Sequence, residues 1–570
     1  MHHVGPIAGV SCHGQWVATA GYDNRLILWD AATRTAVARA SHDHLVNACD
    51  FSHDGRWLVS ASSDYSARVW SLPDLRLSVV LAGHEDDVDM ACFSPDDRLI
   101  ATCALDRIVR VFARDGRLVH AMAGHTGNVL SLAWRDSTRF ITTSVDGTLR
   151  EWDASTGACR RVIEIGMRTD CVAIAPDGTI VAGDDRGRIA VLSGPVSDPV
   201  FTPAHRAGIK KLVLSRDGTR LVTLGYDRAL GVWDMVGPTP VLVAMNPMPA
   251  TIWARAATVL PDGRIAVGTF GGTYALFDPA TAQWDCTGVA AGPALNAVTE
   301  RFGAIVAVGD AGVVTTDGVA GASLGSLCNF VIPGEGRLYA GGHMGELYDA
   351  DSGQMLHRHH SPLNCATLFR RGGMPHCAVG TYTGEILIFA LAGAPRLVRT
   401  IAAHGNAIKA LASSGGQLFA VCANCTVSWH DCETLDEARR VERAHTRIVN
   451  AAVALGDGGF ASVGRDRVLR LWLPTGEGGG DHAFATPHPN SVKALAASPC
   501  GRWLASGSYG GTIALFDRAD SSFAPLQRIS EAGIAALCWS SRAGAFIAAD
   551  YAGALHTVAL PRANVARLAA

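Results

Sequence analysis

The feature that most constrains this chain is a four-residue pattern that returns at nearly fixed spacing. A histidine is followed 26 to 28 residues later by a tryptophan, with a Ser or Thr four residues before an Asp in between. Over the first sets the unit recurs every 39 to 42 residues, so we expect an array of one structural unit. The five complete sets, and a sixth that ends in Phe112, are His3, Thr19, Asp23, Trp29; His42, Ser60, Asp64, Trp70; His125, Thr142, Asp146, Trp152; His205, Thr223, Asp227, Trp233; His445, Ser462, Asp466, Trp472; and His84, Thr102, Asp106.

Each unit alternates short apolar runs with small-residue turns. Period-two runs rich in Val, Ile and Leu, separated by turns such as Pro176-Asp-Gly178 and Pro261-Asp-Gly263, predict antiparallel strands joined as hairpins. One such sheet cannot bury both faces, and packing the sheets in a closed ring leaves no long open edge. The pattern therefore predicts an all-β fold.

These residues resemble the WD-repeat family of β-propellers. The resemblance rests on Gly83-His84 and Gly124-His125, and on Trp29-Asp30, Trp152-Asp153 and Trp233-Asp234. It implies that each His bonds the Asp and the Ser or Thr of its blade, and that the Ser or Thr bonds the Trp indole. Because buried polar groups need partners and the constellation repeats, we interpret it as scaffold and not as catalytic.

Weaker units bring the count to fourteen. They are marked by turns such as Gly183-Asp-Asp-Arg-Gly187, Gly309-Asp-Ala-Gly312 and Gly380-Thr-Tyr-Thr-Gly384. Fourteen units divide naturally into two tandem seven-bladed propellers, for which we expect the ranges 1–285 and 286–570. A slip of one blade, with one terminus closing the other ring, is an alternative, and the segment 564–569 is a candidate for the last outer strand.

Composition excludes several classes. A net charge of −3 offers no basic field for nucleic acid, and no apolar run approaches the length of a membrane span. The N-terminus lacks the features of a secretory signal, and 15 scattered cysteines indicate reduced core residues of a cytoplasmic protein. Frequent Ala, Gly and Arg suggest a bacterial genome.

Three local motifs invite a chemical interpretation, and each has a structural one that we prefer. Gly321-Ala-Ser-Leu-Gly325 matches a nucleophile elbow but lies between β units, without the required strand-turn-helix context. Cys422, Cys425, His430 and Cys432 include a C-x-x-C, but strand alternation sends their side chains in different directions. Of His357, His359 and His360, we assign His360 as the histidine that opens its blade. We expect no metal and no cofactor.

A propeller carries function on the loops at its ends. In the family that this chain resembles, the most exposed positions there lie three and five residues after the His and one before the Asp. In the first ring these are Tyr22, Asn47, Asp87, Asp89, Leu105, Asn128, Arg168, Asp170, Asp185, Lys210, Tyr226, Trp253, Arg255 and Phe270; in the second they are Tyr382, Lys409, Asn450, Arg465, Lys493, Tyr509 and Tyr551.

Exposed aromatic side chains with Arg nearby are typical binding anchors. We therefore expect Tyr22, Tyr226, Trp253 and Phe270 to form a partner-binding patch, with Lys210 and Arg255 beside it. The second ring, with basic and Tyr character, would suit an acidic peptide.

The resulting hypothesis is a non-catalytic scaffold that binds other proteins or peptides through the propeller faces. One form of it is a sensor or adaptor subunit of a bacterial signalling or defence complex. The alternative is a small-ligand-binding or hydrolytic propeller enzyme that uses the central channel. The innermost strands are mostly apolar, which argues against the alternative, with Asp50, Asp87 and Asp89 as exceptions.

Overall fold

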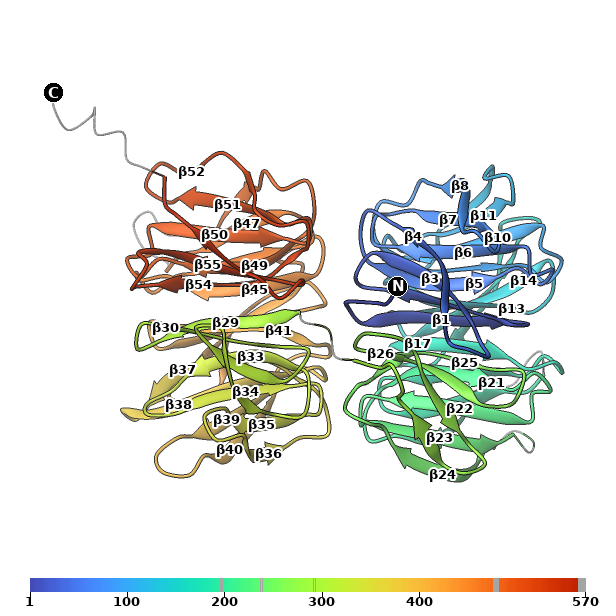
Figure 1. Cartoon of the computed structure of the whole chain (residues 1–570), viewed down its shortest axis with the longest axis horizontal. Helices are drawn as coiled ribbons and strands as arrows, with labels where there is room; N and C mark the ends of the chain where they lie inside the picture. The colour runs from blue at the N-terminus through green and yellow to red at the C-terminus, as the bar shows by residue number, and fades with distance from the viewer. Residues whose placement is uncertain are drawn as a thin grey trace. The chain divides into compact units, whose positions relative to one another are not determined.

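The computed structural model describes residues 1–194, 198–235, 237, 239–290, 292, 294–474 and 481–561. These residues form strands, turns and irregular segments; none of them is helical, so no helix among them could cross a membrane. The chain divides into two compact units, Met1–Gly292 and Pro293–Ala570 (Figure 1).

Each unit is built from small antiparallel sheets whose strands pair in chain order. The first sheet contains β1 (Ile7–His13), β2 (Trp16–Gly21), β3 (Arg25–Asp30) and β4 (Ala36–Ser41). The described residues form 14 such sheets, which confirms the predicted blades. The last sheet has three strands, β54 (Ile534–Ser540), β55 (Ala545–Asp550) and β56 (Leu555–Val558). The outer strand predicted at 564–569 lies outside the described residues.

The first unit is a closed ring of seven blades. Its innermost strands contact one another in order around the ring, and the seventh contacts the first. Residues His3 and Gly272 also exchange backbone hydrogen bonds, at 2.9 and 2.8 Å, across this closure. The innermost strands are β1, β5 (Val46–Phe51), β9 (Val88–Phe93), β13 (Val129–Trp134), β17 (Thr169–Ile174), β21 (Ile209–Leu214) and β25 (Ile252–Val259).

The second unit is a seven-bladed ring of the same kind. Its last innermost strand, β54, contacts its first, β29. Each ring therefore closes on its own strands, and the alternative of a blade slipped into the other ring is wrong. The innermost strands are β29 (Leu295–Arg301), β33 (Cys328–Pro333), β37 (Leu363–Arg371), β41 (Ile408–Ser414), β45 (Val449–Ala454), β49 (Val492–Ala497) and β54.

The first unit extends beyond residue 285, where the sequence placed the boundary. After β28 (Gln283–Asp285) the chain turns back, with the backbone N–H of Val289 donating to Cys286 at 3.0 Å. The N–H of Ala290 then donates to the carbonyl of Gly271 at 3.4 Å. This segment therefore belongs to the seventh blade.

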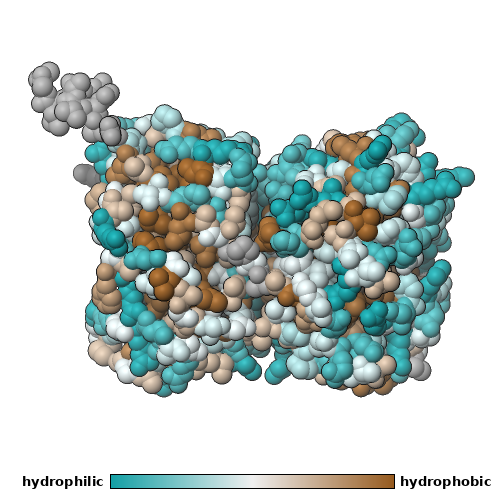
Figure 2. Space-filling model, in the orientation of Figure 1, coloured by the Kyte–Doolittle hydropathy of each residue, from teal (hydrophilic) through white to brown (hydrophobic). Residues whose placement is uncertain are grey.

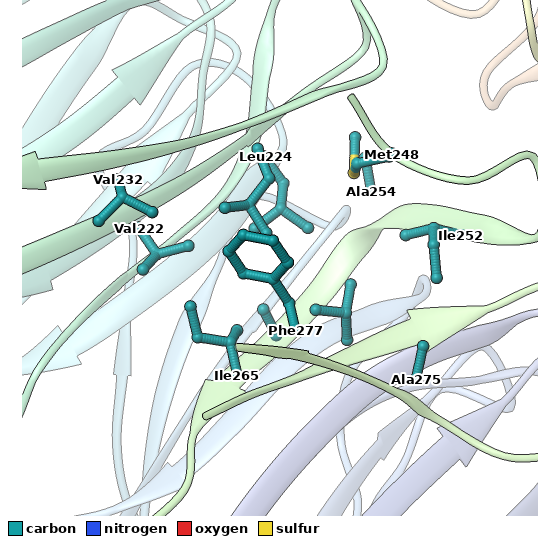
Figure 3. Close-up of a cluster of buried hydrophobic side chains, with 12 residues drawn as sticks. Val222, Leu224, Val232, Met248, Ile252, Ala254, Ile265, Ala275 and Phe277 are labelled. Atoms are coloured by element: carbon teal, nitrogen blue, oxygen red, sulfur yellow. The ribbon is translucent and has the colours of Figure 1, made fainter. Parts of the chain in front are cut away.

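Neighbouring blades pack through layers of apolar side chains. Figure 3 shows one such layer, in which Val222, Leu224 and Val232 of the sixth blade face Ile265 and Phe277 of the seventh. All five are buried, because alternate residues of the inner strands point toward the next blade. The outer strands are more exposed, and Figure 2 shows polar and apolar side chains interspersed over the visible surface. These layers make each ring a stiff frame.

Candidate interaction surface

The repeated polar residues form hydrogen-bonded chains inside the blades. In the first blade, His3 Nδ1 lies 2.9 Å from Asp23 Oδ1 and His3 Nε2 lies 2.8 Å from Thr19 Oγ1. Trp29 Nε1 donates to the same Thr19 Oγ1 at 2.7 Å. The sets that begin at His42, His125, His205 and His445 have the same bonds, each between 2.7 and 2.9 Å.

The direction of these bonds assigns the proton on each histidine. The carboxylate can only accept, so Nδ1 carries a proton and donates to it. In the neutral imidazole Nε2 then accepts from the hydroxyl, which in turn accepts from the indole N–H. In the second blade, burial lowers the pKa of His42, while His42 and other donors hold the pKa of Asp64 below its usual value against the effect of burial. The repeated residues thus satisfy one another.

Other blades keep part of this arrangement. In the third, His84 contacts Asp106 and Thr102 at 2.9 and 2.7 Å, while Phe112 has no donor to add. The thirteenth blade has a histidine network that the sequence pattern did not predict. His488 Nε2 contacts Ser506 Oγ at 2.9 Å, and its Nδ1 contacts Thr512 Oγ1 at 2.7 Å. A Thr on the third strand replaces the Asp of the turn, so the spacing differs from the repeat.

The candidate interaction surface lies at the end of each ring where the innermost strands begin. Since strands alternate in direction, the turn between the second and third strands of every blade lies at the same end. We call these strand starts and turns the rim. In most blades the second residue of the innermost strand is a β-bulge; in β21, Ile209 pairs with Gly225 and Lys211 with Leu224, leaving Lys210 unmatched.

The rim of the first ring contains an aromatic cluster at the closure between its seventh and first blades. Trp253 packs edge-on against Tyr22, with ring centroids 4.9 Å apart, and lies 6.2 Å from Phe270. Trp253 is 6% exposed and Phe270 is 2% exposed. The expectation that these two residues are exposed anchors is therefore wrong: they fill the seam where the ring closes.

Lys210, expected as a free positive anchor, belongs to an ion-pair network. Its Nζ lies 2.5 Å from Asp170 Oδ2 and also contacts Asp185, both on the fifth blade. Arg168 contacts the same two carboxylates at 2.7 and 3.5 Å. Burial alone would lower the pKa of Lys210, but the two carboxylates raise it above its usual value. The charges of Lys210 and Arg168 are thus matched within the ring.

The two expected acidic positions differ from each other. Asp87 is 3% exposed and accepts a hydrogen bond from Ser63 Oγ at 2.9 Å, so it braces neighbouring blades and is not a surface residue. Burial raises the pKa of Asp89 to about 6, with Arg255 and Arg168 opposing the shift. Burial also raises the pKa of Asp50 to about 6, and its carboxylate accepts from the N–H of Phe93 at 3.2 Å.

Several expected residues of the first rim remain at least partly exposed, among them Arg255, Tyr22 and Tyr226. Arg255 is exposed, with its guanidinium 5.7 Å from the Trp253 ring. Tyr22 and Tyr226 are partly exposed, and Lys210 lies 4.7 Å over the Tyr226 ring. These three side chains are part of the surface that a partner can reach here.

The expected residues of the second ring also lie at its rim. Lys493 is the bulge residue of β49 and Lys409 that of β41, and both are partly exposed. Arg465 lies in the turn between β46 (Phe460–Gly464) and β47 (Val468–Trp472). Tyr509, in the next blade's turn, stacks on Tyr551 at 6.1 Å.

Sequence reasoning missed the role of a set of asparagines that join neighbouring blades, although it named Asn47 and Asn450 as exposed rim positions. Each occupies the bulge position and donates its side-chain N–H to the carbonyl of the first residue of the next innermost strand. The acceptor lies 2.6 to 3.2 Å away. The pairs are Asn47 with Val88, Asn296 with Cys328, Asn329 with Leu363, Asn364 with Ile408 and Asn450 with Val492. Their signal in the sequence is an Asn directly after the first apolar residue of the strand.

The candidate chemical motifs fall on blade strands. Ser323 lies on β32 (Val319–Ser323), an outer strand of the eighth blade, with no helix after it. Cys422 and Cys432 are buried, and His430 Nε2 contacts Ser428 Oγ at 3.1 Å. These positions match the blade interpretation of both motifs.

One group among the described residues brings three possible metal ligands together. His359, His360 and Glu385 have ligand atoms within 4.8 Å of one another. His359 Nε2 lies 3.3 Å from Glu385 Oε2, and its Nδ1 accepts from the N–H of Ser361 at 3.2 Å. His359 is also more buried than His360, so the assignment of His360 as the blade-opening histidine is wrong. The cluster replaces the His–Asp pair of the tenth blade.

Comparison with known proteins identifies the repeats. The model of the WD domain, G-beta repeat, matches residues 1–30, 36–71, 75–112, 116–153 and 483–517. The chain contains WD repeats. The matched segments fall in blades one to four and thirteen, where the histidine networks are complete or nearly so. Blades six and twelve lie outside the matched segments but have complete histidine networks, and the other unmatched blades keep the antiparallel sheet.

The curated relatives share part of their length with this WD-repeat chain. It is 25% identical over 246 residues to Protein tipD of Dictyostelium discoideum, covering 42% of this chain and 40% of that protein. It is 27% identical over 174 residues to the Ribosome biogenesis protein WDR12 homolog of Drosophila mojavensis, covering 26% and 41%. Nuclear distribution protein nudF of Emericella nidulans is 24% identical over 178 residues, covering 27% and 40%. The chain thus spans about two fifths of the length of these relatives.

Proposed function

We propose that this WD-repeat chain is a non-catalytic, cytoplasmic scaffold that binds other proteins through the rims of its rings. The proposal rests on one observation, the location of the hydrogen bonds that the repeated polar residues of the chain form. The repeated His, Asp, Ser and Thr side chains bond one another inside the blades, so they are committed to the frame. Accessible aromatic and charged side chains are left on the rims.

The surface best suited to a partner on the first ring is formed by Tyr22, Tyr226 and Arg255. Tyr and Arg are the residue types that most often dominate binding energy at protein interfaces. They stand on rigid turns, so little conformational entropy is lost when a partner binds. Two rings on one chain also allow an adaptor to hold two partners, which raises the effective concentration of one near the other. In a bacterial host, such an adaptor would serve a signalling or defence complex.

Affinity capture from the native lysate tests the proposal. Wild-type protein is compared with Tyr226→Ala/Arg255→Ala, and with Val243→Ser as a matched control. Val243 is exposed on β24 (Val241–Pro247), an outer strand with four exposed apolar residues. The proposal predicts a stoichiometric protein partner that is lost with the rim variant and kept with the control.

A partner that is kept by the rim variant and lost with Val243→Ser would place the binding site on the outer strand. Absence of any protein partner, together with a small molecule or metal retained in native mass spectrometry, would favour the ligand-binding alternative.

A further inference from the structure

The two rings carry a lysine at the same position of the same blade. Each is the bulge residue of the innermost strand in the sixth blade of its own ring, Lys210 in the first ring and Lys493 in the second. The turn of that blade carries a tyrosine in each ring, Tyr226 and Tyr509. The first ring therefore serves as an internal reference for what a lysine needs at this position.

In the first ring the fifth blade supplies two carboxylates to the lysine. Asp170 is the bulge residue of that blade and Asp185 lies in its turn. Both contact Lys210 Nζ, as described above. At the reference position, the ammonium group of Lys210 is therefore paired with two carboxylates.

In the second ring neither of these positions holds an acid. The bulge residue of the fifth blade is Asn450, whose side-chain N–H is already donated to Val492 at 2.7 Å. The turn residue is Arg465, a second cation. Asp466, the next residue, is bonded to His445 at 2.9 Å. Lys493 therefore faces an amide and a guanidinium where Lys210 faces two carboxylates.

A third cation lies close enough to act on Lys493. Lys409 is the bulge residue of the fourth blade of the second ring, with its Nζ 5.6 Å from the centre of the Tyr382 ring. Burial, together with the charges of Lys409 and Arg465, lowers the pKa of Lys493 to about 7. Within the described parts of the chain, no carboxylate pairs with Lys409 or Lys493. An anion from outside the chain can therefore supply a countercharge at this position.

We propose that the rim of the second ring binds an oxyanion of the phosphate class between Lys409, Arg465 and Lys493. A phosphate group carries close to two negative charges and several acceptor oxygens, which suits two ammonium groups and a guanidinium. The bound anion takes the place that Asp170 and Asp185 have in the first ring. A free oxyanion needs no protein partner, so this site does not depend on the proposed function.

The site is tested by calorimetric titration of the full chain with inorganic phosphate and pyrophosphate at constant ionic strength. The wild type is compared with Lys493→Met and Lys409→Met, which keep the length and apolar stem of the side chain. Arg98→Met, at an exposed side chain between β9 and β10 (Leu99–Ala104) of the first ring, is the matched control. We expect pyrophosphate to bind once per chain, with affinity reduced at least tenfold by either lysine variant and unchanged by the control.

Circular dichroism establishes that each variant is folded, and if Lys493→Met is not, Lys409→Met and Lys409→Gln decide the result. No binding by the wild type, or binding that the folded lysine variants leave unchanged, overturns the proposal.

A phosphoserine peptide distinguishes two sources of the anion. Binding tighter than that of inorganic phosphate, and lost with the same variants, assigns the oxyanion to a modified protein. Equal affinity assigns it to a small phosphorylated molecule.

Discussion

The two rings share one fold but stabilise it with different polar bonds. Five of the six His–Asp–Ser/Thr networks of the repeat lie in the first ring, within single blades. Four of the five asparagine bonds lie in the second ring, between blades. Both arrangements satisfy buried polar groups, so a blade that has lost its histidine network can still be held by its neighbour.

The rims differ in the same way. The first rim matches Lys210 and Arg168 with Asp170 and Asp185, whereas among the described residues of the second ring no carboxylate pairs with Lys409 or Lys493. The comparison teaches that position in a repeat does not determine charge balance. One rim is complete by itself, and the other is suited to an anion.

The largest expected effect is on the closure of the first ring. Trp253→Ala removes a buried aromatic side chain from the seam, and such truncations cost about 3–5 kcal/mol. Denaturant unfolding with hydrogen-exchange mass spectrometry should show a loss of protection in the first and seventh blades. Tyr226→Ala, at a partly exposed ring, is the control and should cost much less. Equal exchange in Trp253→Ala and wild type would contradict the assignment of the seam.

The next effect concerns the unpaired lysine of the second ring. The folded pKa of Lys493, about 7, lies below the unfolded value of 10.5, so the folded state binds fewer protons between these pH values. Stability from this group therefore rises with pH through that window. Lys493→Met should raise stability by about 1–3 kcal/mol at pH 6 and by less at pH 9. Thermal unfolding at both pH values checks this, and a gain that is larger at pH 9 would refute it.

The asparagine bonds between blades allow the stability of the two rings to be compared directly. Asn364→Ala leaves the carbonyl of Ile408 without its side-chain donor, at a cost of about 1–2 kcal/mol. Asn47→Ala removes the same bond in the first ring and should cost a similar amount if the bond acts locally. Matched denaturation curves measure both. A much larger cost in the second ring would mean that its blades depend on these bonds collectively.

The smallest effect is at Asp89. Its folded pKa, about 6, lies above the ordinary 3.8, so the folded state holds more protons in between and loses stability as pH rises. Asp89→Asn should therefore stabilise the first ring by about 1 kcal/mol at pH 7.5 and by less at pH 4.5. Thermal unfolding at the two pH values is the measurement. A loss of stability at pH 7.5 would show that attraction to Arg255 outweighs burial.

The blades, their number and the closed rings could be predicted because six His networks have a fixed spacing and the weaker units keep recognisable hairpin turns. The rim was harder to predict. A β-bulge shifts the side-chain alternation by one residue, so the role of Asn364 or Lys210 does not follow from period-two counting. Ring closure also buries Trp253 against Tyr22, which is 231 positions away in the chain. Pairing of Lys210 with Asp170 likewise crosses between blades and leaves no local pattern.

The central claim is that partners bind at the rims, and hydrogen-exchange footprinting of the captured complex tests it most directly. The account predicts protection of the turns around Tyr22 and Tyr226, or around Arg465 and Tyr509, with the outer strands unchanged. Protection concentrated on outer strands such as β24, with the rim turns exchanging as in the free protein, would contradict it.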